Sequence, residues 1–203
     1  MAKTQKDQPA KASGATAEAK SAPKADITKT IVLTGADIVQ IGAEAELLVG
    51  GKNYNTAIIS QVAGIRAPQF RAISSIAFHL LLDETKVDLP NEVTEAVRTA
   101  DLDICAEAGL ENEPVAVRSS AAGEDSCKKA FAGLQDTYLN IVGDERCVEA
   151  YQWDCASAYN LRSMTYRREA ILDAVHKAEE TGDDSIAETA KKEWAIENTS
   201  LSV

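Results

Sequence analysis

The chain has 203 residues, of which 45% are hydrophobic and 26% are charged, and a formal net charge of −11 at pH 7. These values are typical of a soluble globular domain with enough apolar residues to bury a core. No apolar run approaches the roughly 20 residues that a transmembrane helix needs, and the N-terminus lacks an apolar signal segment, so we expect a cytoplasmic protein.

The charge is unevenly distributed along the chain. Residues 1–30 carry six Lys against three acidic residues, and the remainder has a net charge of −14. An acidic body repels a polyphosphate backbone, so we expect no nucleic-acid partner. A nucleotide needs only a small basic pocket and is not excluded.

The cysteines form no CxxC pair, and neither histidine lies at metal-ligand spacing from a second ligand. We therefore expect reduced thiols and no structural zinc site. The four cysteines are Cys105, Cys127, Cys147 and Cys155.

Residues 1–30 are rich in Ala, Lys, Ser and Pro and contain almost nothing to bury, which predicts a disordered tail. Its lysines suit either targeting to a membrane surface or, as we prefer, solubilisation and the tethering of a partner. Ordered structure is expected to begin at residues 31–38.

The first ordered half is predicted to alternate strands and helices. Leu47–Val49 is predicted to form a short strand, residues 50–51 a turn, and residues 54–62 a helix that stops at Gly64. "FRAISS" predicts a strand to about Ile73 and then a helix capped by Ser74 or Ser75.

The second half begins with apolar residues at helical spacing over residues 93–104, with Gly109 closing the helix. "PVAVRSS" and "DTYLNIVG" are predicted strands. A helix is expected from Asp144, as its N-cap, to about Glu180, and another over residues 184–196. Strands interleaved with helices predict an α/β or α+β domain.

Gly50, Gly51 and Lys52 stand at a predicted strand-to-helix turn. Glycines let a backbone approach a ligand closely, helix N-terminal amides attract anions, and the lysine adds a positive charge. The segment is not a P-loop, because GxxxxGK[ST] is absent. Alone it fits either a phosphate site or an ordinary turn.

Arg118 ends an apolar strand and precedes two serines. A guanidinium at the rim of a sheet lies where α/β proteins bind ligands, and its planar fork suits phosphate oxygens. The alternative is a salt bridge to Glu124 or Asp125. The following "FAGLQDTYLN" fits either a mobile flap over a ligand or a plain hairpin corner.

Five stretches in order closely resemble the N-terminal nucleotide-binding segment of the pyruvate phosphate dikinase and phosphoenolpyruvate synthase family, which includes rifampicin phosphotransferase. They are "VGGKN", "GIRAPQFRAIS", "VAVRSSAAGED", "FAGLQDTYLNI" and "SAYNLRSMTYR". The resemblance covers about residues 46–168, which places a partial dikinase-type domain at residues 31–180 and a C-terminal helix and tail at residues 181–203.

The resemblance implies an ATP-grasp-like half with a mixed sheet flanked by helices, which binds ATP with Mg²⁺. Lys52 and Arg118 match the residues that contact the phosphates, and Arg167 matches a second arginine of the last stretch. No catalytic or metal-binding residue is assigned. The residues expected to bind the nucleotide are Gly50, Gly51, Lys52, Arg118, Ser119, Glu124, Gly133, Gln135, Asp136, Thr137 and Arg162.

The chain also departs from the family pattern. Complete members carry a second ATP-grasp half, a phosphohistidine domain and a pyruvate-binding barrel, for which this chain is too short. His79 lies outside any Gly-Gly-x-x-Ser-His context and is expected on a helix surface or in packing. The family's Pro-x-Gly-Phe is shortened to Pro68-Gln69-Phe70.

These observations leave two main hypotheses. In the first, the chain is the ATP-binding component of a phosphotransferase that needs a partner chain for catalysis. In the second, it is a non-catalytic accessory or regulatory protein that keeps the fold. A functionless fragment is disfavoured by the well-formed C-terminal helix.

Overall fold

The computed structural model describes residues 30–81, 89–121, 133–195 and 201–203. Within these ranges no helix has the length and apolar character needed to cross a membrane. The elements, in chain order, are β1 (Val32–Thr34), α1 (Gly35–Ile41), α2 (Ala45–Ser60), β2 (Arg71–Ile73), α3 (Ser75–Leu81), α4 (Asn91–Ala108), β3 (Val115–Arg118), β4 (Ser120–Ala121), β5 (Thr137–Ile141), α5 (Asp144–Ser157), α6 (Leu161–Thr181), α7 (Ser185–Glu193) and β6 (Leu201–Ser202).

The described strands pair antiparallel, β1 with β2, β3 with β5 and β4 with β6. The backbone of Val203 connects the third pair to the first, because it donates to Ile73 O at 3.0 Å and accepts from Ile73 N at 2.6 Å. Strands interleaved with helices are confirmed, but these strands form small antiparallel ladders where we expected a mixed sheet.

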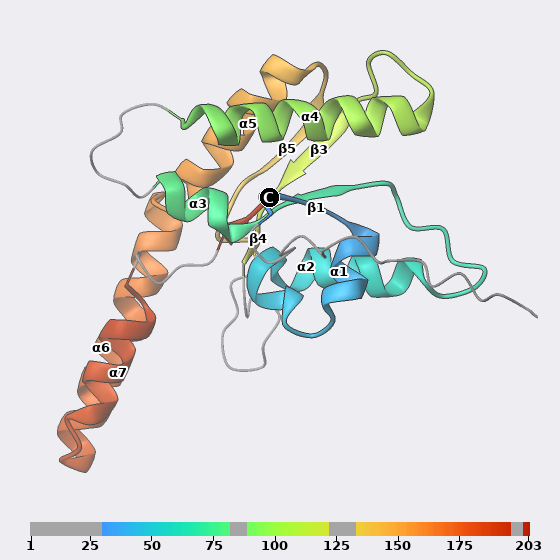
Figure 1. Cartoon of the computed structure of the whole chain (residues 1–203). Coiled ribbons are helices and arrows are strands. Elements are labelled where there is room, and N and C mark those ends of the chain that lie inside the picture. The colour runs from blue at the N-terminus through green and yellow to red at the C-terminus, as the bar shows by residue number, and fades with distance from the viewer. Residues whose placement is uncertain (1–29, 82–88, 122–132, 196–200) are drawn as a thin grey trace, which may run out of the picture.

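Two buried clusters form the core, one on each side of the short strands. The first contains Val97 of α4 and Tyr151 of α5 and also includes residues of β2, α3, β4 and β5. The second contains Leu33 of β1, Ile38 of α1 and Val49 of α2. Figure 1 shows α4 and α5 on one side of the central strands and α1 and α2 on the other, with α6 and α7 projecting as a helical hairpin.

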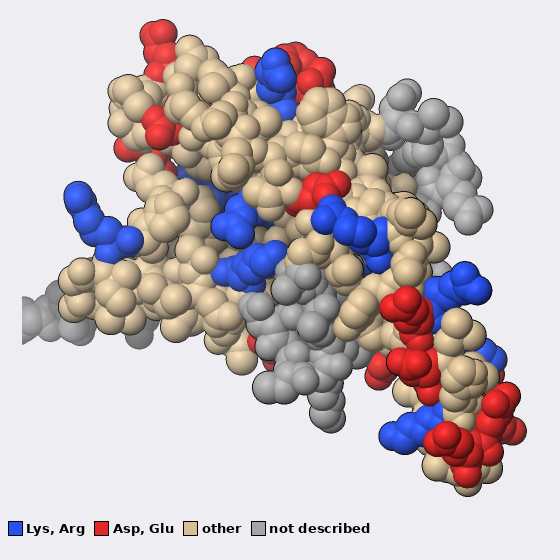
Figure 2. Space-filling model, turned by 180° about the vertical axis from the view of Figure 1, so that it is seen from behind, with Lys and Arg blue, Asp and Glu red and all other residues tan. Residues whose placement is uncertain are grey.

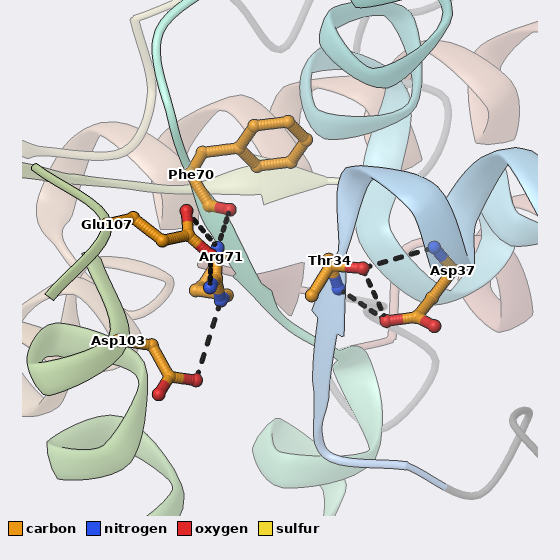
Figure 3. A network of polar contacts seen from close by, with 6 residues as sticks. All are labelled: Thr34, Asp37, Phe70, Arg71, Asp103 and Glu107. Carbon is orange, nitrogen blue, oxygen red and sulfur yellow. Dashed lines mark hydrogen bonds and ion pairs between the residues drawn. The ribbon is translucent and has the colours of Figure 1, made fainter.

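Local side-chain bonds determine where several helices begin and end. At the start of α1, Asp37 N donates to Thr34 Oγ1 at 3.2 Å and Thr34 N donates to Asp37 Oδ2 at 2.9 Å, which is a capping box (Figure 3). Gly109 closes α4 in the left-handed conformation with φ 70°, as predicted.

The predicted strand at Leu47–Val49 is wrong, because these residues belong to α2. Ala45 and Val49 lie one helical turn apart and are buried, whereas Leu47 is 68% exposed. The helix is kinked at Gly50, whose φ of 69° and ψ of 168° are not helical. The predicted turn at the two glycines is therefore a kink between two helical segments, and the helix ends at Ser60, before Gly64.

The predicted single helix from Asp144 to Glu180 is two helices, α5 and α6. Asn160 begins the second helix, because its side chain accepts a bond from Ser163 N at 2.8 Å. Asp144 is the first residue of α5 and not its cap, which is Gly143 with φ 91°. The apolar periodicity continues through this break and does not reveal it.

Candidate functional site

The kink at Gly50 places the Gly-Gly-Lys segment directly against β4. A Cβ atom added to Gly50 would lie 2.2 Å from Ser120 O and 2.4 Å from Ser120 Oγ, so no larger residue fits without movement of the backbone. Asn53 N donates to Ser120 Oγ at 3.3 Å. The second helical segment of α2 therefore starts beside the "RSS" segment, 67 residues away in sequence.

Lys52 and Arg118 lie in the wall of the same cavity, which has a volume of about 760 Å³. Lys52 Nζ donates to Ser119 O at 3.1 Å, so its ammonium group is beside the residue that follows Arg118. Ser119 is buried, whereas Arg118 is exposed at the end of β3. The two cations expected at the phosphates thus come from separate segments to one cavity.

The rest of this cavity is formed by α4, β3, α5 and residues 68–73. Its charged lining residues are Lys52, Arg71, Asp101, Glu113 and Arg118. On the face opposite to that of Figure 1, Lys and Arg side chains gather around a hollow in the middle of the molecule (Figure 2). The cavity lining therefore combines three cationic and two acidic side chains, in a protein with a net charge of −11.

The third cation of the cavity, Arg71, is bound to the polar face of α4. Its side chain is 8% exposed and pairs with Glu107, and its Nε lies 3.8 Å from Asp103 Oδ2 (Figure 3). Nη1 also donates to Phe70 O at 3.1 Å. Arg71 consequently joins β2 to α4 across one side of the cavity.

The expected flap residues form a second group, outside the cavity wall. Asp136 Oδ1 accepts from Arg162 Nη2, and Leu134 O accepts from Asn160 Nδ2 at 2.9 Å and from Ser163 Oγ at 3.0 Å. The flap is thus attached to the start of α6. Gly133 is exposed with φ 77°, Gln135 is half-buried, and Arg162 pairs with a carboxylate that we had also expected at the nucleotide.

Thr137 connects the two groups, because it is the register partner of Arg118 in the β3–β5 ladder. The predicted residues Gly50, Gly51, Lys52, Arg118, Ser119 and Thr137 are thereby gathered around β3 and β4. Glu124, and the alternative salt bridge of Arg118 to Glu124 or Asp125, lie outside the described residues.

Arg167 and His79, which the sequence also singled out, both lie outside the cavity wall. Arg167 is buried and its Nη1 donates to Trp194 O at 3.3 Å, which places it between α6 and the end of α7. Burial lowers the pKa of this arginine. His79 is exposed on α3, as one of our two alternatives for it expected.

The buried thiols have strongly raised pKa values. Burial, with the hydrogen bond to Asp101 and nearby negative charge, raises the pKa of Cys147 to about 12. Burial raises the pKa of Cys155 to about 12 as well, although the hydrogen bond to Tyr151 acts in the opposite direction. These thiols are therefore protonated and unreactive at neutral pH.

Sequence reasoning missed Asp101 and Ser202. Asp101 had a signal, because it lies four residues after Val97 and so falls on the apolar face of the predicted helix. Ser202 had none. Its hydroxyl donates to Ser120 O at 2.7 Å from 82 residues away.

In the part of the chain that the structure describes, no three His, Cys, Asp or Glu side chains are grouped as a metal site would require.

Comparison with known proteins places these residues in a family. Residues 85–203 match the family described as "Pyruvate phosphate dikinase, AMP/ATP-binding domain". This range contains Arg118 and Ser119, and the Gly-Gly-Lys segment precedes it.

Individual relatives agree with the family match. The chain is 32% identical over 156 residues to a probable phosphoenolpyruvate synthase of Staphylothermus marinus, which covers 60% of this chain and 19% of that protein. It is 31% identical over 170 residues to a rifampicin phosphotransferase of a Streptomyces species. This match covers 68% of this chain and 19% of that protein. The phosphoenolpyruvate synthase of Pyrococcus furiosus is 34% identical to this chain over 87 residues. This match covers 43% of this chain and 11% of that protein. The chain therefore spans at most about a fifth of the length of these relatives.

Proposed function

Because the chain belongs to the pyruvate phosphate dikinase AMP/ATP-binding domain family, we propose that it binds ATP in the cavity beside β3, with the phosphates between Lys52 and Arg118. The observation that carries the proposal is the convergence of these two cations on one cavity from α2 and β3. An arginine fork and a lysine ammonium together suit a polyphosphate.

The residues of the cavity fit such a ligand in three respects. The glycine kink brings Lys52 beside β4, where its ammonium group lies next to Ser119 and can meet an anion. The arginine is exposed at the end of its strand and accessible to a ligand. The volume of about 760 Å³ lies in the range of small-molecule sites, about 300–1,000 Å³.

We also propose that Mg²⁺ arrives with the nucleotide and is held mainly by its phosphate oxygens. The flap residues Gln135, Asp136 and Thr137, with Gly133 and Arg162, would then close towards the phosphates from the β5 side. This requires the Asp136–Arg162 pair to separate or to move as a unit.

At the level of the whole activity, we propose a component of a dikinase-type phosphotransferase that works with further domains on a partner chain. Phosphoryl transfer depends on positioning and on charge neutralisation. Lys52 and Arg118 supply positive charge for one side of the phosphates, and the acceptor site would come from elsewhere.

Calorimetric titration with Mg-ATP tests the nucleotide site. We expect Arg118→Ala to weaken binding about tenfold or more, since a charge-assisted hydrogen bond contributes about 1.5–3 kcal/mol. Arg168→Ala is the matched control, because Arg168 is an exposed arginine on α6 that does not line the cavity. Absence of binding by the wild-type chain, or equal losses in both variants, would refute the proposed site.

A further inference from the structure

The cavity beside β3 is lined by two chemically different sets of side chains. Lys52 and Arg118 are the cations expected at the phosphates, whereas α4, α5 and β3 also contribute apolar residues. These are Val97, Ala100, Ile104, Val115, Val117 and Tyr151. A ligand that contacts both sets needs an anionic part and a largely apolar part.

One carboxylate, that of Asp101 on α4, lies in this apolar part of the wall. Its residue is 5% exposed. The Cys147 thiol donates a hydrogen bond to Asp101 Oδ1, with an Sγ–Oδ1 distance of 3.2 Å. A thiol is a weak donor. Among the described residues the other oxygen, Oδ2, accepts no hydrogen bond, and no Lys or Arg forms an ion pair with Asp101.

This arrangement is unusual for a buried carboxyl group, because buried polar groups are ordinarily satisfied by strong hydrogen-bond donors. Packing alone does not require an acid here, since the α-helical neighbours Val97 and Ala100 fill similar positions with apolar groups. The carboxylate therefore has capacity to accept hydrogen bonds from a group inside the cavity.

Asp101 lines the same cavity as Lys52 and Arg118, so one ligand can reach both the cations and this carboxyl group. The cavity volume of about 760 Å³ is large enough for a nucleoside beside the phosphates.

We infer that Asp101 accepts a hydrogen bond from a donor on the nucleoside part of the nucleotide and determines which nucleotide this cavity selects. The inference rests on the proposed function, because it takes the phosphates to lie between Lys52 and Arg118. Two groups supply the donor chemistry, the ribose hydroxyls and an exocyclic amine of the base.

Calorimetric titration of Asp101→Asn with Mg-ATP and with inorganic tripolyphosphate tests the assignment. The amide keeps an acceptor for Cys147 but loses the charge and offers donors of its own. We expect ATP to bind the variant about tenfold or more weakly, and tripolyphosphate to bind wild type and variant equally. Asp173→Asn, on the exposed surface of α6, is the matched control.

Ligand variants on the wild-type chain keep the test independent of any folding defect. A 2′,3′-dideoxy-ATP that binds about tenfold more weakly than ATP identifies the ribose hydroxyls as the donor, and an equivalent loss with ITP identifies the amine. If both analogues bind as tightly as ATP, or Asp101→Asn weakens ATP and tripolyphosphate alike, the inference is overturned while the phosphate site stands. If the wild-type chain binds neither ATP nor tripolyphosphate, the proposed function fails first.

Discussion

Replacement of Gly50 by alanine tests the contact that joins the glycine kink to β4. The φ of 69° and ψ of 168° belong to a region that is essentially restricted to glycine, and an alanine there costs about 1–3 kcal/mol. The added Cβ would also lie 2.2 Å from Ser120 O and 2.5 Å from Ser120 C, both backbone atoms. Relief of such an overlap requires a backbone shift, which adds about 1–3 kcal/mol. We therefore expect a loss of about 2–6 kcal/mol in the free energy of unfolding.

Urea unfolding followed by circular dichroism measures this loss, and Gly42→Ala provides the matched control. Gly42 has φ 82° and ψ −151°, a similar glycine-restricted conformation, but a Cβ there meets no atom within 4 Å. The control should lose only the free energy that alanine costs in a glycine-restricted backbone conformation. The difference in the free energy of unfolding between the two variants therefore measures the overlap with Ser120. Equal losses at the two positions would show that the kink does not press against β4, and the shared phosphate site would lose its structural basis.

Two further predictions concern the thiols and the flap. The pKa of Cys147 and of Cys155 in the folded state is about 12, above the ordinary 9.0. The unfolded chain therefore releases these protons first as the pH rises. The contribution of the two thiols to the free energy of unfolding should be constant below pH 9 and should fall between pH 9 and 12. In urea unfolding at a series of pH values, each thiol should lower the free energy of unfolding by up to about 1.4 kcal/mol per pH unit. Cys155→Ala should remove the part of this slope that Cys155 contributes, and an unchanged slope would contradict the burial of this thiol. The Asp136–Arg162 pair is substantially exposed, so a double-mutant cycle of Asp136→Asn and Arg162→Met should give a coupling of less than about 1 kcal/mol. A larger value would mean that the pair stabilises the fold and does not open readily for a ligand.

The family resemblance implied that Lys52 and Arg118 share one site, whereas the residues around them did not by themselves predict this approach. Each residue stands beside residues of restricted conformation or small size, two glycines in one case and two serines in the other. Those neighbours indicated close backbone approach. They did not indicate that the two segments approach each other, which depends on contacts across 67 residues of sequence.

The errors in the predicted elements have a common physical origin. Leu47–Val49 is β-prone by composition, but the burial of Ala45 and Val49 against the second core cluster favours a helix. In the region after Asp144, helical periodicity continues through residues 158–160, where Asn160 caps a new helix by a bond to Ser163 N. Periodicity reports which face is buried, and it does not report an interruption that a single side chain produces.

Ser120 explains why the two phosphate-binding segments act as one unit. Its backbone and hydroxyl touch Gly50, its Oγ accepts from Asn53 N, and its carbonyl accepts from Ser202 Oγ. The preceding residue, Ser119, accepts the bond from Lys52. The position of the lysine is thus determined by a two-residue strand that is held from both sides, by the glycine kink and by β6. Because Ser120 is 1% exposed, it cannot contact a phosphate from solvent, and its contribution to any ligand must pass through the position of Lys52.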